Sequence, residues 1–159
     1  MKTRIRVAGL AIDNDSILLV KHTQNGEQFW ITPGGGLEGD ERFEECAARE
    51  TLEETGLDVR VGSLAYIKEF ISPSQDAYHL ELFFQLQFDG TDVITGSDPD
   101  MTPLSPLIVD VDWIAKDDLF NGFPDRVAPA IIATPEFWEQ AAAGFPSVEY
   151  IDLRREVTP

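Results

Sequence analysis

The strongest constraint on the fold is a run of three glycines that directly precedes a helical pattern rich in glutamate. Neither a helix nor a strand continues easily through Gly34 to Gly36. From Asp40 to Thr55 the sequence predicts a helix, with Asp40 as its N-cap and Gly56 at its C-terminal end. The chain therefore needs special backbone geometry immediately before this helix.

The side of the predicted helix that faces the core changes from apolar residues to carboxylates after one turn. Side chains at i, i+3 and i+4 share one side of a helix. The apolar patch comprises Phe43, Cys46 and Ala47, and the carboxylates belong to Glu50, Glu53 and Glu54. Repulsion costs about 0.2–0.5 kcal/mol per close pair, so an inward acidic cluster implies a compensating cation, and oxygen ligands favour Mg²⁺ or Mn²⁺. Taken alone, the same residues also fit a solvated face on which Glu45 and Glu53 flank Arg49 without binding anything.

Glycines and carboxylates together form a recognisable motif, because bare backbone can approach a metal or a phosphate where any Cβ would obstruct it. Residues 35–57 resemble the Nudix box, Gly-x5-Glu-x7-Arg-Glu-U-x-Glu-Glu-x-Gly-U, in which U is aliphatic. Every fixed polar and glycine position matches. The departure is Thr51 at the first U position, which is close to valine in size.

The resemblance implies an α/β/α sandwich with a mixed β-sheet, in which the box forms a loop-helix-loop metal site. It implies hydrolysis of a pyrophosphate bond in a nucleotide, with Mg²⁺ as cofactor and Mn²⁺ as a substitute. The implied metal ligands are Glu50, Glu53, Glu54 and the carbonyl of Gly34; the implied catalytic residues are Glu53, Glu54 and Arg49, with Glu41 and Gly35 supporting the loop. The general base stays open among Glu53, Glu54, Asp110 and Asp112.

Substrate choice depends on residues outside the box. Pro73 lies 16 residues after Leu57, and this spacing resembles the downstream proline of ADP-ribose pyrophosphatases. We therefore favour ADP-ribose or a nucleotide sugar over a MutT-like activity on nucleoside triphosphates. The alternative that is not an enzyme is a regulatory module that senses a nucleotide by binding it without turnover. Further candidates for substrate contacts are Arg4, Arg6 and Trp30, although exposed ion pairs and core packing also explain them.

Elsewhere the pattern predicts strands and one long connection within a single domain spanning residues 1–159. Expected strands cover residues 3–12 and 16–23, which would form a hairpin, and residues 29–31, 57–71, 78–89 and 107–115. Residues 90–106 are too long for a turn, so they form either a lid that closes near the substrate or a surface loop. A C-terminal helical segment is expected at about residues 124–143, broken at Pro135.

Charge and composition limit the partners. Twelve Lys and Arg against 29 Asp and Glu give a net charge of −17, which repels polyanions and argues against binding duplex nucleic acid. A small nucleotide is the expected partner, and a homodimer is left open. The N-terminal apolar run is too short for a signal peptide, and no stretch reaches the length of a membrane span, so we expect a cytoplasmic protein.

Overall fold

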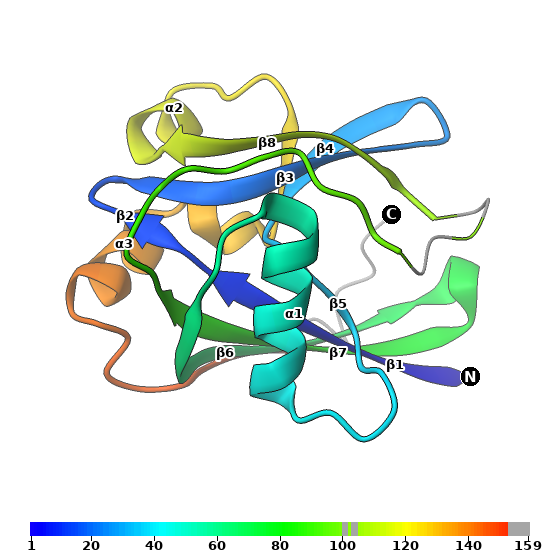
Figure 1. Cartoon of the computed structure of the whole chain (residues 1–159). Helices are drawn as coiled ribbons and strands as arrows, with labels where there is room; N and C mark the ends of the chain where they lie inside the picture. Colours follow the sequence, from blue (N-terminus) through cyan, green and yellow to red (C-terminus); the bar gives the residue numbers. More distant parts are fainter. Residues whose placement is uncertain (100–101, 103–104, 153–159) are drawn as a thin grey trace.

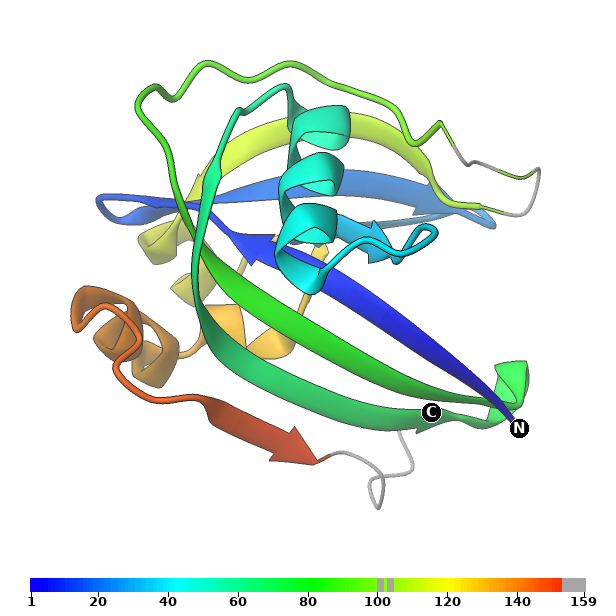
Figure 2. The ribbon, with the colours of Figure 1, turned by 60° about the horizontal axis from the view of Figure 1, so that its bottom comes forward.

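The fold consists of two mixed β-sheets between helices, shown in two views in Figures 1 and 2. The computed structural model describes residues 1–99, 102 and 105–152. Helix α1 (Phe43–Thr55) lies on one side of the sheets, and α2 (Lys116–Phe120) and α3 (Pro135–Ala142) lie on the other. This arrangement confirms the predicted α/β/α sandwich with mixed strands. Among the described residues, no helix is both long and apolar enough to cross a membrane.

The first sheet carries α1 on one face. Its strands, in spatial order, are β10 (Glu149–Asp152), β6 (Arg60–Ser72), β7 (Ala77–Gln87), β1 (Lys2–Leu10) and β5 (Gly34–Gly36). β1 runs parallel to β7 and antiparallel to β5. The apolar face predicted along β7 is buried at Leu82, Phe84 and Leu86, but Glu81 and Phe83 on the opposite face are buried as well, so exposure does not alternate.

The second sheet has β3 at its centre. Its strands are β2 (Ile12–Asp13), β3 (Ser16–Gln24), β4 (Glu27–Ile31) and β9 (Arg126–Ala128), with β8 (Leu107–Ala115) on the other side of β3. One core cluster joins both sheets and α3: Leu10 and Phe83 come from the first sheet, Leu19 from the second and Phe137 from α3. The two sheets therefore share this hydrophobic cluster.

The predicted N-terminal hairpin is largely wrong. The first strand ends at Leu10, and only the two residues of β2 pair with β3. β1 instead takes β7 and β5 as partners, because its successive side chains pack into different core clusters: Val7 in one, Ala8 and Leu10 in another. Ala11, fully buried, lies where the chain passes from one sheet to the other.

The glycine run was expected to interrupt regular structure, but Gly34 to Gly36 form strand β5 against β1. The absence of side chains permits this close pairing. A Cβ on Gly34 would lie 2.3 Å from the carbonyl oxygen of Val7 and 2.6 Å from the Cα of Ala8. Glycine is therefore required here by close approach within the sheet.

Helix α1 begins later than predicted. Its N-cap is Arg42 rather than Asp40, because a turn precedes it in which the Glu41 N–H donates to the Glu38 carbonyl at 3.1 Å. The carboxylate of Glu45 accepts the Arg42 N–H at 2.7 Å, which satisfies one free donor at the helix start. Phe43, expected in the apolar patch, is 39% exposed. The predicted end at Gly56 is confirmed by its left-handed conformation, with φ of 72°.

The predicted C-terminal helical segment is only partly helical. It contains β9, the 3₁₀ turn η2 (Ala130–Ala133) and α3. Pro135 starts α3 instead of breaking a helix, because its missing N–H falls where a helix has no acceptor. Thr134 caps this helix by accepting the Phe137 N–H at 3.4 Å. Strand β10, which extends the first sheet, was not predicted.

Candidate active site

The glycine strand β5 lies directly against the glutamates of α1. The N–H of Gly34 donates to Oε2 of Glu54 at 3.2 Å. A Cβ on Gly35 would come within 2.3 Å of Oε1 of Glu50. The two halves of the box motif therefore touch through a backbone that only glycine allows.

Two of the three carboxylates among the predicted metal ligands are almost completely buried. Glu50 is 5% exposed and Glu54 is 3% exposed. Burial raises the pKa of Glu54 to about 8, although the positive charge of Arg6 acts in the opposite direction and lowers this pKa. Burial also raises the pKa of Glu50, against its hydrogen bond from Arg49. Buried carboxylates with raised pKa values are a known feature of functional sites, because their charged forms need a partner.

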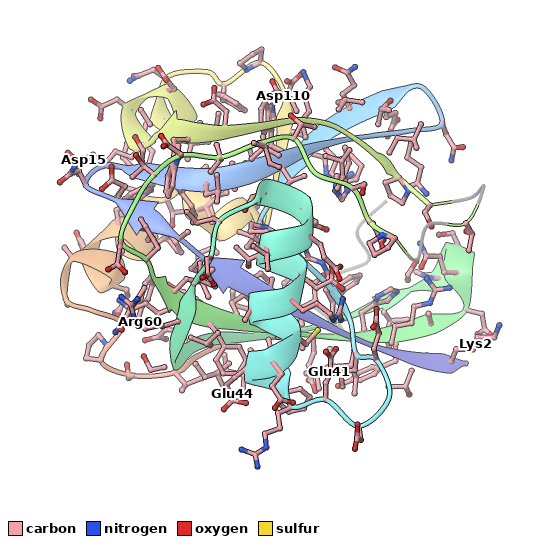
Figure 3. The ribbon with its side chains drawn as sticks, viewed as in Figure 1. Lys2, Asp15, Glu41, Glu44, Arg60 and Asp110 are labelled. Atoms are coloured by element: carbon pink, nitrogen blue, oxygen red, sulfur yellow. The ribbon has the colours of Figure 1, made fainter. Side chains whose placement is uncertain are left out.

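Arg49 connects the turn before α1 with the carboxylates on the helix. It holds Glu41 through two bonds, from Nε at 3.0 Å and from Nη2 at 2.7 Å, and Figure 3 shows Glu41 beside the start of α1. Its Nη1 lies 2.8 Å from Glu50 and 3.3 Å from Glu53. The hydrogen bonds from Arg49 lower the pKa of Glu41 to about 2. A two-bond arginine–carboxylate contact fixes both partners in orientation as well as in charge.

The donor set suits a divalent cation, although its side chains are not arranged around one. Within the described residues, no group of three or more His, Cys, Asp or Glu side chains is preformed as a metal site. Glu50 is turned to Arg49, and Glu54 to the N–H of Gly34. Two buried carboxylates beside the partly exposed Glu53 are hard oxygen donors, of which Glu50 and Glu53 share the single charge of Arg49, and this chemistry fits a hard divalent cation. The carbonyl of Gly34 accepts a hydrogen bond from Arg6 at 3.5 Å.

The connection between β7 and β8 crosses the C-terminal end of α1 and is anchored there. Backbone N–H groups of Ile94, Gly96 and Ser97 donate to the last carbonyls of the helix at 2.9, 2.9 and 3.2 Å. We call residues 94–97 the strap; it passes over the top of α1 in Figure 1. Of the predicted segment 90–106, residues 100–101 and 103–104 lie outside the described part of the chain. The described first part is a bound strap rather than a free loop.

The strap brings in an acidic residue that sequence reasoning missed. The negative charge of Asp98 adds to burial in raising the pKa of both Glu50 and Glu54. The sequence candidates were Asp110 and Asp112, which are exposed on β8 and accept the N–H of the residue that follows each of them. The segment's acidic content was visible in the sequence, but only the strap's contacts with α1 single out Asp98.

A cavity of about 510 Å³ opens on the other face of the first sheet. Its lining includes Phe29, Lys68, Phe70, Gln75, Glu81 and Arg126. The ammonium group of Lys68 lies 3.0 Å from Glu81 and 4.6 Å from the ring centre of Phe70. Phe70 also stacks on His79, with ring centres 4.4 Å apart. The cavity thus combines aromatic faces with charged groups of both signs.

The four predicted substrate residues lie in different surroundings. Trp30 is 6% exposed in the core, and its indole N–H donates to Asp125 at 3.0 Å, so its ring is not free to stack on a base. Pro73 starts the turn η1 (Pro73–Gln75), whose last residue lines the cavity. Arg4 is exposed, whereas Arg6 is partly buried and bonded to the carbonyl of Thr32.

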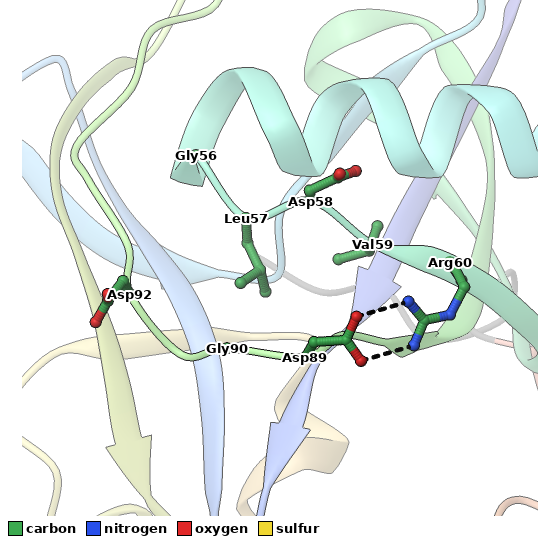
Figure 4. Close-up of a pocket in the computed structure, with 8 residues that line it drawn as sticks. All are labelled: Gly56, Leu57, Asp58, Val59, Arg60, Asp89, Gly90 and Asp92. Carbon is green, nitrogen blue, oxygen red and sulfur yellow. Dashed lines mark hydrogen bonds and ion pairs between the residues drawn. The ribbon is translucent and has the colours of Figure 1, made fainter.

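A smaller hollow near the end of α1 does not have the features of an active site. It is drawn in Figure 4, where Arg60 and Asp89 form a two-bond ion pair at 3.1 and 3.2 Å. Both side chains are exposed. Their charges satisfy each other in solvent, so this pair needs no ligand.

Comparison with known proteins gives matches over most of the chain. The family model described as NUDIX domain matches residues 2–133. Phosphatase NudJ of Escherichia coli (strain K12) is 27% identical over 123 residues, which are 76% of this chain and 73% of that protein. A NUDIX hydrolase from Nitrosomonas europaea superposes with a TM-score of 0.66 at 26% identity, covering 90% of each chain. An ADP-ribose pyrophosphatase from Streptococcus suis shares the fold, with a TM-score of 0.57 and 18% identity over 92% of this chain and 98% of that one.

Proposed function

The chain belongs to the NUDIX domain family, and from that membership we propose that it hydrolyses a pyrophosphate bond in a nucleoside diphosphate derivative with the help of a divalent cation. The observation that carries this proposal is the burial of Glu50 and Glu54 against the glycine strand. Like charges are kept in a poorly solvated place only where something compensates them. A solvated helix face, the alternative left open by the sequence, would not bury these carboxylates.

Glu50, Glu53 and Glu54 would hold the cation, with Mg²⁺ preferred and Mn²⁺ as a substitute. When bound, the cation would supply positive charge to the pyrophosphate and help water to ionise. Arg49 orients Glu50 and Glu53 while holding Glu41, and Glu41 accepts the Glu38 N–H at 2.9 Å, which supports the loop. Gly35 leaves space for the carboxylate of Glu50.

Proton transfer needs a basic group close to the attacking water. Glu53 and Glu54 belong to the cluster itself, and the side chain of Glu53 keeps 26% of its surface exposed to solvent. Asp98 joins them as a candidate because its charge acts on the same cluster. We assign the base to this group and not to Asp110 or Asp112, which are exposed on an edge strand.

The cavity is the proposed place for the remainder of the substrate. Aromatic rings such as Phe29 and Phe70 suit a base or a ribose, and Lys68 and Arg126 suit charged or hydroxylated groups. The turn that starts at Pro73 contributes Gln75 to the cavity lining, which supports a role for this turn in substrate choice. We therefore propose ADP-ribose or a nucleotide sugar as substrate, processed by one domain that spans the chain.

A hydrolysis screen tests this proposal directly. The purified protein would be incubated with Mg²⁺ and ADP-ribose, nucleotide sugars, dinucleoside polyphosphates or nucleoside triphosphates, and the products identified by mass. Cleavage of ADP-ribose or a nucleotide sugar between its phosphates is the expected result. Preferential release of pyrophosphate from triphosphates would favour the MutT-like alternative. Nucleotide binding without any product, across metals and pH values, would indicate a sensing module.

A further inference from the structure

One guanidinium nitrogen of Arg6 is buried without a hydrogen-bond partner. Nη2 of this residue donates to the carbonyl oxygens of Thr32 at 2.5 Å and Gly34 at 3.5 Å. Nη1 makes no such bond to any described residue, although it is shielded from solvent. A guanidinium stays charged in proteins, and leaving one of its donors buried and unpaired is costly. This arrangement calls for an acceptor that the described part of the chain does not provide.

The position of Arg6 places it between the carboxylate cluster and the cavity. On β1 it lies opposite Gly36 of β5 on one side and opposite Glu81 of β7 on the other. Glu81 lines the cavity, and the Gly34 carbonyl that Arg6 contacts belongs to the residue whose N–H binds Glu54. The charge of Arg6 also acts on Glu54 itself. Arg6 is thus adjacent to both parts of the proposed site.

A second unpaired donor lies beside it. The hydroxyl oxygen of Thr32 is buried without a partner among the described residues, and Thr32 is 0% exposed. Nε2 of His22 is also buried without a partner among the described residues, and burial together with the charge of Arg6 lowers the pKa of His22 to about 4, so its ring is neutral. The unpaired Nη1 of Arg6 and the unpaired hydroxyl of Thr32 are donors that match the acceptor oxygens of a phosphate group.

We propose that Nη1 of Arg6 binds a non-bridging oxygen of the substrate's pyrophosphate at the junction between the carboxylates and the cavity. This inference rests on the proposed function and adds a phosphate contact from the chain itself. It also answers an electrostatic problem, because a chain with a net charge of −17 repels an anionic substrate. Arg6 supplies fixed positive charge where the pyrophosphate must lie, independently of the cation.

The test measures binding of methylenediphosphonate, whose P–C–P bridge cannot be hydrolysed as a phosphoanhydride, to the protein in Mg²⁺ by isothermal titration calorimetry. Arg6→Gln should weaken binding about 10- to 100-fold, the effect typical of a lost charged hydrogen bond. Arg60→Gln is the matched control, because it removes the same charge from an exposed ion pair and should stay within about 2-fold of the parent. Unfolding curves would establish that both variants are folded.

Arg6→Lys provides a second variant that keeps the charge and can still reach Thr32. Because lysine lacks the fork of a guanidinium, we expect it to weaken binding about 3- to 10-fold. Parent-like affinity in folded Arg6→Gln, or in Arg6→Lys if the glutamine variant does not fold, would overturn the inference. If the protein hydrolyses its substrate but the Arg6 variant binds methylenediphosphonate with parent-like affinity, the proposed function stands and the role of Arg6 fails. If phosphonate binding depends on Arg6 but no substrate is hydrolysed, the phosphate contact stands and the proposed activity fails.

Discussion

Replacing Glu54 with glutamine separates the catalytic role of this carboxylate from its cost to folding. The side chain is 3% exposed and accepts one bond, from the N–H of Gly34. Glutamine has nearly the same shape, and its carbonyl oxygen can accept the same bond, but it cannot carry a negative charge. We expect Glu54→Gln to reduce turnover in Mg²⁺ by about 100-fold or more, because the cluster loses one charged ligand.

The effect on stability follows from the pKa of Glu54. Burial raises this pKa from an ordinary 4.5 to about 8, so the folded protein binds the proton more tightly than the unfolded chain. This contribution to stability is fully present below about pH 4.5 and is lost as the pH rises through about 8. At about 1.4 kcal/mol per pKa unit, the stability lost on ionising Glu54 in the folded protein is at most about 5 kcal/mol. Because local relaxation lowers this loss, we expect a value within about 2–5 kcal/mol.

The assay is urea unfolding of the metal-free protein at pH 6 and at pH 9. At pH 6 the variant should be the more stable by at most about 2 kcal/mol, because Glu54 is still protonated in the folded protein but already ionised in the unfolded chain, and at pH 9 this margin should be larger. The exposed Glu44→Gln is the control, since any small loss at the helix start should be equal at the two pH values. A variant less stable than the parent at pH 9, or unimpaired in turnover, would refute the reasoning.

Three further predictions follow from the same site. A chelator should abolish hydrolysis and Mg²⁺ or Mn²⁺ should restore it, whereas full activity in metal-free buffer would contradict the mechanism. Gly35→Ala should lower turnover about 10-fold or more with little change in unfolding free energy, because the new Cβ, 2.3 Å from Oε1 of Glu50, displaces only the end of a side chain. The control Gly36→Ala adds a Cβ with nothing within 4 Å and should retain more activity. Equal losses of turnover in the two variants would contradict this explanation. Gly96→Ala should destabilise the protein by about 1–3 kcal/mol in urea unfolding, because its Cβ would meet a backbone carbonyl of α1 at 1.9 Å. Gly90→Ala, which meets no atom within 4 Å, should be neutral, and parent-like stability of Gly96→Ala would show that the strap adjusts freely.

The sequence predicted those features that depend on local pattern. The end of α1 at Gly56 follows from the conformational freedom of glycine, and the apolar face of β7 follows from the period-two spacing of Leu82, Phe84 and Leu86. Thr51, the departure from the box, is fully buried and donates its hydroxyl to the carbonyl of Ala47 at 2.7 Å, so it fits the helix without an unpaired group.

Features that depend on long-range pairing were missed. β1 looks like half of a hairpin in sequence, and only its pairing with β7, far along the chain, assigns it to the other sheet. The glycine run pairs as β5 because β1 is already there to receive it. Asp98 was missed for the same reason, since its relation to the glutamates arises from backbone bonds between the strap and the end of α1.

The strap bears on how such a site can diversify. Its anchoring bonds run from backbone N–H groups to backbone carbonyls, so they do not depend on which side chains the strap carries. Apart from Gly96, where a side chain would strike the helix, and apart from proline, which has no N–H to donate, a change of side chain leaves the donor and acceptor atoms of this attachment in place. Mutation can therefore sample new side chains beside the glutamates while the helix end stays capped, and substrate preference can drift over generations at little cost to folding.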